Sequence, residues 1–99
     1  MRPPEPCENL EDVREVIDGL DREILRLLGN RASYVAAAAR FKTGPRGVRA
    51  PERQRAMLAR RREWAEEEGL DPDFVEGLYR NIVSHFVGRE MDHWQGGNA

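Results

Sequence analysis

An apolar seam runs through the first half of the chain and constrains its fold more than any other feature. Between Asn9 and Lys42, the seam residues recur at alternating steps of three and four: Leu10, Val13, Ile17, Leu20, Ile24, Leu27, Arg31, Tyr34, Ala38 and Phe41. This spacing is the period of one face of an α-helix, held for about four and a half heptads. Asn9, with Asp12 after it, provides an N-cap, and no proline interrupts the run. The sequence therefore predicts one helix over residues 9–42.

A helix of this length is too long for the chain to cover by itself. At 1.5 Å per residue it extends about 50 Å, whereas a compact domain of about 100 residues has a radius of gyration of only about 13 Å. The 99 residues form a single domain, so another chain must cover the seam. We expect an obligate homodimer with two-fold symmetry.

Arg31 occupies a seam position where leucine is expected. A buried guanidinium costs several kcal/mol unless an anion meets it. One interpretation is a buried salt bridge to an acidic residue of another helix. The other is a small anionic ligand enclosed by the helices, and the residue alone leaves both open.

Two further cations lie on the same predicted helix. Arg14 is 17 residues before Arg31, about 25 Å along the axis, so one chain cannot hold a small ligand with both. In an antiparallel dimer, however, Arg14 of one chain approaches Arg31 of the other, which gives two equivalent shared sites. Lys42 lies almost three helical turns after Arg31 on nearly the same face, either as a ligand contact or as a solvated C-terminal cation.

Proline, glycine and capping residues divide the remaining chain. Residues 1–8 are an irregular arm with three prolines, and residues 43–50 (TGPRGVRA) form a loop. Pro51 begins a second helix over 51–68, which Gly69 ends. Asp71 and Pro72 open a third helix over 71–94, followed by a frayed tail at 95–99. The fold class is therefore all-α, with three helices.

The second and third helices each carry an apolar stripe. The stripe of the second helix is narrow and consists of Met57, Leu58, Trp64 and Ala65. Most of the arginines and glutamates of this helix form a solvated face. Arg53, in the first turn, is the arginine expected to turn inward. In the third, the stripe advances by fours: Phe74, Leu78, Ile82, Phe86, Glu90 and Trp94. Glu90 thus faces inward between aromatic side chains, where it can also neutralise a buried cation.

Composition excludes several classes of function. Sixteen lysines and arginines against 18 acidic residues give a formal charge of −2. The chain therefore lacks the excess of basic residues expected of a nucleic-acid-binding protein. Cys7 is the single cysteine, so neither an intrachain disulfide nor a cysteine metal quartet is expected. The N-terminus has no signal-type apolar segment and no apolar run reaches membrane length, so we expect a cytoplasmic protein.

Several stretches together resemble one enzyme family. They are Cys7, Asp12–Asp18 (DVREVID), Gly29–Arg31, Ala39–Lys42 (ARFK), Ala50–Arg53 (APER) and, most specifically, Trp64–Gly77 (WAEEEGLDPDFVEG). With them the chain resembles the all-helical, AroQ-type chorismate mutases, and most closely the isochorismate pyruvate lyases of salicylate and siderophore synthesis. The resemblance implies the chorismate mutase type II fold, an intertwined homodimeric helical bundle.

The resemblance also implies a site for a cyclohexadiene dicarboxylate bearing an enolpyruvyl ether. Arg14 of the partner chain and Arg31 would bind carboxylates, and Arg53 matches a further site arginine. Lys42 would donate a hydrogen bond to the ether oxygen, where negative charge develops as the C–O bond breaks. Such pericyclic reactions need no nucleophile, metal or cofactor.

Two positions depart from the family pattern. Glu90 stands where glutamine is usual, and a carboxyl group there can donate to the ether oxygen only when protonated. Mutases of this class commonly carry acidic residues at the positions of Ala50 and Gln54, and neither is acidic here. This favours a lyase, although Gln54 can still bind a ring hydroxyl or amino group.

Three functions follow from these observations. The first is cleavage of isochorismate to salicylate and pyruvate, with weak chorismate mutase activity. The second is rearrangement of chorismate or of its 4-amino-4-deoxy analogue. The third belongs to another class, a helical dimerisation module without chemistry, in which Arg31 serves only a salt bridge.

Overall fold

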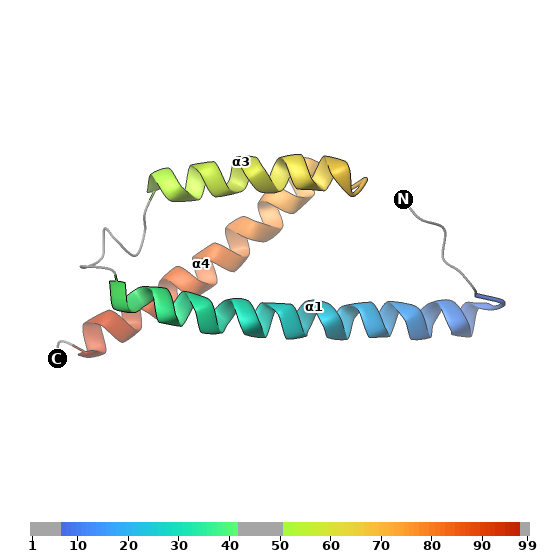
Figure 1. Cartoon of the computed structure of the whole chain (residues 1–99), viewed down its shortest axis with the longest axis horizontal. Coiled ribbons are helices and arrows are strands. Elements are labelled where there is room, and N and C mark those ends of the chain that lie inside the picture. The colour runs from blue at the N-terminus through green and yellow to red at the C-terminus, as the bar shows by residue number, and fades with distance from the viewer. Residues whose placement is uncertain (1–6, 42–50, 98–99) are drawn as a thin grey trace. The chain divides into compact units, whose positions relative to one another are not determined.

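The computed structural model describes residues 7–41 and 51–97, with side chains of the second range as far as Gly88. Its elements are α1 (Leu10–Ala38), the short 3-10 helix η1 (Ala39–Phe41), α3 (Pro51–Glu67) and α4 (Pro72–Gly97) (Figure 1). Within these ranges the chain contains no strand. The predicted all-α class with three long helices is therefore confirmed.

The helix boundaries differ slightly from the predicted ones. The α-helical part of α1 ends at Ala38 and tightens into η1, and Lys42 lies outside the described residues. α4 continues to Gly97, three residues beyond the predicted end. Once a helix is formed, each added residue gains a backbone hydrogen bond, and one glycine costs only about 1 kcal/mol. The predicted loop at 43–50 also lies outside the described residues.

Local capping sets the start of α1 as predicted. The Asn9 side-chain oxygen accepts a hydrogen bond from the Asp12 amide at 2.9 Å. The Asp12 carboxylate in turn accepts from the Glu8 amide at 3.1 Å. The first bond satisfies a donor that the first helical turn leaves without a partner, and the second ties residue 8 to that turn.

The chain divides into two compact units, residues 1–35 and 36–99. The first contains most of α1, which has no buried residue. Eight of its large apolar side chains are 48% to 78% exposed: Leu10, Val16, Ile17, Leu20, Ile24, Leu25, Leu27 and Tyr34. A continuous apolar surface of this kind is typical of an interface rather than of a solvated helix.

The second unit contains a helical hairpin in which α3 packs against α4. Its buried apolar residues are Met57, Leu58 and Ala65 of α3 and Val75 of α4. The predicted stripe of α3 is thus confirmed except for Trp64, which is 42% exposed even though Arg60 and Arg61 lie over its ring.

The first two residues of the predicted stripe of α4 do not lie on the face that packs on α3. Phe74 and Leu78 are 61% and 45% exposed, whereas Val75 is only 7% exposed. Adjacent helical residues lie about 100° apart, so a contact centred on Val75 directs Phe74 to the side. Phe74 and Leu78 therefore lie beside this contact and remain largely exposed.

The turn between α3 and α4 has the geometry of a Schellman motif. Gly69 adopts a φ of 74°. The Leu70 amide donates a hydrogen bond to the Ala65 carbonyl at 2.8 Å, and the Gly69 amide donates one to the Glu66 carbonyl at 3.1 Å. The Asp71 carboxylate then accepts from the Asp73 amide at 2.9 Å and caps α4. The predicted roles of Gly69 in ending α3 and of Asp71 in capping α4 are therefore confirmed.

Candidate functional site

A cavity of about 320 Å³ lies between α3 and α4. Two helical faces line it: Pro51, Gln54, Met57 and Leu58 of α3, and Arg80, Val83, Ser84 and Val87 of α4. Such a volume is at the lower end of the range of small-molecule sites, which combine apolar walls with a few polar groups. Here the lining residues with polar side chains are Gln54, Arg80 and Ser84.

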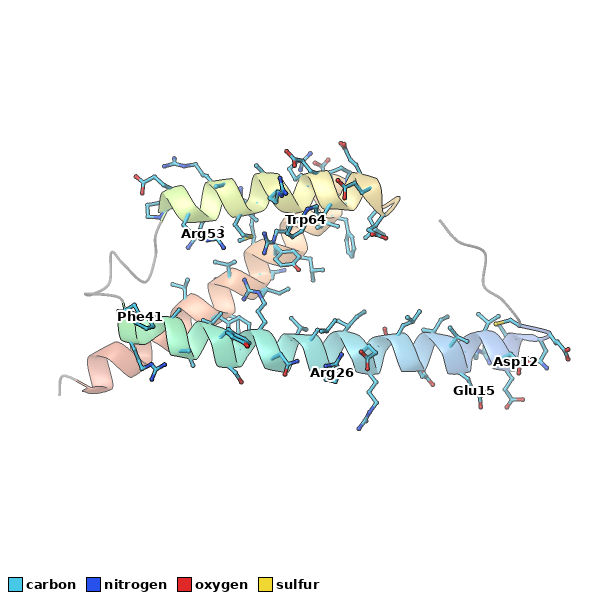
Figure 2. All side chains as sticks on the ribbon, in the orientation of Figure 1. Asp12, Glu15, Arg26, Phe41, Arg53 and Trp64 are labelled. Carbon is cyan, nitrogen blue, oxygen red and sulfur yellow. The ribbon has the colours of Figure 1, made fainter. Side chains whose placement is uncertain are left out.

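Of the residues predicted from sequence, Gln54 lines this cavity. Arg53, which we expected to turn inward, is exposed and is not one of the lining residues (Figure 2). The reason is geometric, because neighbouring residues on a helix point about 100° apart. Once Gln54 faces α4, Arg53 of the same chain faces the side.

Arg14 and Arg31 are not brought together within one chain. Arg14 is exposed and Arg31 half-buried, on the same continuous helix α1. Their separation along that helix is about 25 Å, as the sequence predicted, so they do not form one site within a chain. Lys42 lies outside the described residues, and so does the side chain of Glu90, whose backbone belongs to α4.

Arg80 and Ser84 are cavity residues that the sequence patterns did not single out. With Val83 and Val87 they occur at steps of three and four, a spacing that places them on one side of α4. The aromatic stripe on a different side of the same helix is the more prominent pattern. The spacing of the cavity residues was therefore visible in the sequence, but it was a weaker pattern than the aromatic stripe.

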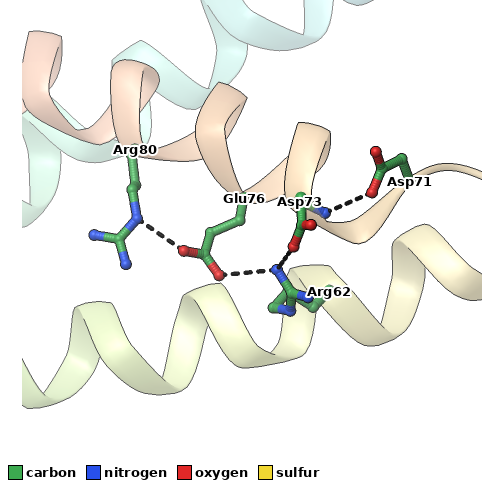
Figure 3. A network of polar contacts seen from close by, with 5 residues as sticks. All are labelled: Arg62, Asp71, Asp73, Glu76 and Arg80. Atoms are coloured by element: carbon green, nitrogen blue, oxygen red, sulfur yellow. Dashed lines mark hydrogen bonds and ion pairs between the residues drawn. The ribbon is translucent and has the colours of Figure 1, made fainter.

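A chain of ion pairs joins Arg80 to α3 (Figure 3). Arg80 donates through Nε to Oε2 of Glu76 at 2.9 Å. The other oxygen of Glu76, Oε1, accepts from Nη1 of Arg62 at 3.1 Å. Arg62 Nη1 also donates to Oδ1 of Asp73 at 2.9 Å. The network therefore bridges the two helices from the turn to the cavity.

These bonds shift the ionisation of the groups that make them. The pKa of Glu76 is lowered, chiefly by the hydrogen bond from Arg80. The charge of Arg80 and the hydrogen bond and charge of Arg62 lower it further, whereas desolvation opposes the shift. The hydrogen bond to Asp73 raises the pKa of Arg62 in the same way. Glu76 is thus held as a carboxylate between two guanidinium groups.

Arg61 has a packing role in the hairpin. Its guanidinium carbon lies 4.6 Å from the ring centre of Trp64 and 5.4 Å from that of Tyr79. The stacking buries Nε of Arg61, which has no hydrogen-bond partner among the described residues. The run of three arginines at 60–62 is therefore not uniformly solvated, because Arg61 and Arg62 both contact α4.

Metal-binding and membrane-spanning features are absent from the part of the chain that the structure describes. No group of three or more histidine, cysteine and acidic side chains in these ranges is arranged to hold a metal ion. No described helix is long and apolar enough to cross a membrane.

Comparisons with known proteins relate this architecture to one family. Residues 13–91 match the model of the family described as chorismate mutase type II. The chain is 46% identical over 95 residues to an isochorismate pyruvate lyase of Pseudomonas aeruginosa, covering 96% of this chain and 94% of that protein. It is also 36% and 34% identical to the T-proteins of Haemophilus influenzae and Enterobacter agglomerans, covering 84% of this chain and 22% of each T-protein. The family match and the nearly full-length similarity agree with the three-helix architecture, and the chain belongs to the chorismate mutase type II family.

Proposed function

We propose that this protein is an isochorismate pyruvate lyase that converts isochorismate to salicylate and pyruvate. The observation that carries the proposal is the 46% identity to a protein of that name along almost the whole of both chains. Chorismate rearrangement, or rearrangement of the 4-amino-4-deoxy analogue, is the second candidate, since the family model is that of chorismate mutases. We assign it as a weaker second activity of the same site.

The chemistry of this reaction suits a site made of fixed charges. The ether C–O bond breaks, a ring hydrogen moves to the methylene carbon of the enolpyruvyl group, and the ring becomes aromatic. No nucleophile, metal or cofactor is required. The protein contributes by folding the enolpyruvyl group over the ring and by stabilising charge on the ether oxygen.

In this proposal each predicted residue has a role in substrate binding or catalysis. Arg31 and the Arg14 side chain of the second copy bind the two carboxylates, and Arg53 adds positive charge. Lys42 donates to the ether oxygen, and Glu90 donates to it when protonated. Gln54, which lines the α3–α4 cavity, contacts the ring hydroxyl.

The proposal includes a two-fold homodimer whose sites are each built from both chains. The exposed apolar side chains of α1 support it, because one chain leaves them in solvent. The separation of Arg14 from Arg31 supports it too, since only a second copy can bring one beside the other. We further place the enzyme in the cytoplasm, where it supplies salicylate for siderophore synthesis.

A product assay by NMR tests the function. Purified protein is given isochorismate, chorismate and 4-amino-4-deoxychorismate separately, at pH about 5 and about 8, so that both protonation states of an acidic donor are sampled. The proposal predicts salicylate and pyruvate from isochorismate at a far higher kcat/KM than any rearrangement. Prephenate or its amino analogue as the dominant product would reassign the reaction. Absence of any product would favour the dimerisation module.

A further inference from the structure

Arg80 is a cationic residue that lines the α3–α4 cavity. Among the described residues that line the cavity, Arg80 is the one that carries a charge. The opposite wall contributes Gln54 and apolar side chains. A cavity with apolar walls and one arginine among its lining residues has the composition expected for an organic anion.

The guanidinium of Arg80 is connected to α3 through Glu76. An isolated i,i+4 ion pair on a helix surface is weak, and its long side chains remain free to move. Here the partner of Arg80, Glu76, is only 27% exposed and is itself bonded to Arg62 of α3. Because Arg62 is also bonded to Asp73, the carboxylate that orients Arg80 has a fixed position.

The bond to Glu76 engages Nε of Arg80, so the edge formed by the two terminal nitrogens can still bind a carboxylate. Glu76 accepts from Nε, and Figure 3 shows both terminal nitrogens of Arg80 directed away from Glu76. A guanidinium has five N–H donors, and the paired donors of one edge match the two oxygens of a carboxylate. Glu76 therefore orients Arg80 without using up its donors.

We propose that Arg80 is a substrate-recognition residue that binds a carboxylate of the substrate in the α3–α4 cavity, and that Glu76 is its positioning residue. The inference rests on the proposed function, which supplies a substrate with two carboxylates. It adds a contact from α4 to those assigned to Arg14, Arg31 and Arg53. The charge of Arg80 thereby favours dianionic substrates over analogues that have lost a carboxylate.

The chain offers a closely matched control in Arg60. Arg60 and Arg80 are 63% and 64% exposed, and each pairs with a glutamate of its own helix, Glu63 and Glu76. Arg60 is not one of the residues that line the cavity. Loss of a surface charge alone should therefore affect both positions equally, whereas substrate recognition should affect only Arg80.

Steady-state kinetics with isochorismate test the inference on four variants. Arg80→Gln should raise KM about tenfold while kcat changes less than about threefold, since a charge-assisted hydrogen bond to the bound substrate is lost. Arg80→Lys, which keeps the charge but not the paired donors, should lie in between. Glu76→Gln should raise KM about threefold, because Arg80 loses its fixed orientation. Arg60→Gln should behave as the wild type.

The outcomes separate the inference from the function on which it rests. A lowered melting temperature with an unchanged KM in Arg80→Gln would show a purely structural role and overturn the inference. An equal rise of KM in Arg60→Gln would also overturn it, because general electrostatic attraction would then explain both. Failure of the wild type itself to form salicylate and pyruvate would contradict the proposed function instead. If Arg80→Gln does not fold, Arg80→Lys provides the same comparison.

Discussion

Arg62 of α3 donates through Nη1 to Oε1 of Glu76 on α4 at 3.1 Å, and this bond links the two helices of the hairpin. The same nitrogen reaches Oδ1 of Asp73 at 2.9 Å, in the first turn of α4. The hairpin is therefore held at the turn end by charge and along its length by apolar packing of Met57, Leu58 and Val75. Each part can be tested separately.

The lowered pKa of Glu76 predicts a loss of stability in acid. A group whose pKa is depressed in the folded state stabilises the fold above its unfolded pKa, and this stabilisation is lost as pH falls through the folded pKa. Melting temperatures measured between pH about 6 and about 3 should therefore fall less steeply in Glu76→Gln than in the wild type. Glu63→Gln is the control, because its ion pair with Arg60 is longer, at 3.6 Å. Parallel curves for Glu76→Gln and the wild type would contradict the prediction.

The Gly69 backbone predicts a second stability effect. Its φ of 74° disfavours a side chain, although a Cβ added at this position would meet no atom within 4 Å. Gly69→Ala should therefore cost about 1 kcal/mol and lower the melting temperature by several degrees. Gly88→Ala, inside α4 with equal space, should instead stabilise by about 0.5–1 kcal/mol. Thermal unfolding monitored by circular dichroism measures both, and equal effects of the two substitutions would refute a role for the Gly69 backbone.

The exposed face of α1 predicts dimerisation through its apolar residues. Ile24→Glu places a charge in the seam and should yield monomers, because a charge buried without a partner is costly. Arg22→Glu introduces the same residue two positions away, on the opposite side of the helix, and should leave the dimer intact. Sedimentation velocity at micromolar concentration distinguishes the two states. A monomeric wild type would contradict the proposed assembly.

A glutamate at position 90, where glutamine is usual in the family, predicts an unusual pH dependence of turnover. If protonated Glu90 donates to the ether oxygen, kcat should fall as pH rises through the pKa of Glu90. Glu90→Gln keeps a donor at every pH, so its kcat profile should be flatter. Profiles that coincide in wild type and Glu90→Gln would remove Glu90 from the catalytic role.

The sequence predicted correctly those features that depend on neighbouring residues or on long motifs. Asn9 caps α1 and Gly69 ends α3 because capping bonds join residues only a few positions apart. The family was predicted from extended motifs, and the match over residues 13–91 confirms it.

Features that depend on distant packing were harder to predict. Trp64 and Phe74 were expected in the core, but which side of each helix is buried depends on the angle at which α3 meets α4. Arg80 with Glu76 has the spacing of an ordinary surface ion pair, so only the bond of Glu76 to α3 and the cavity distinguish it. The roles of Arg14, Arg31, Lys42, Arg53, Gln54 and Glu90 stay predictions.

A subunit-mixing experiment tests the central claim most directly, namely that each site takes Arg31 from one chain and Arg14 from the other. Arg14→Ala and Arg31→Ala are each expected to be inactive as homodimers, because every site then lacks one arginine. When the two variants are unfolded together and refolded, half of the dimers are mixed, and each mixed dimer has one intact site. We expect recovery of about one quarter of the wild-type lyase activity. No recovery, with mixed dimers verified by mass spectrometry, would contradict a site shared between chains.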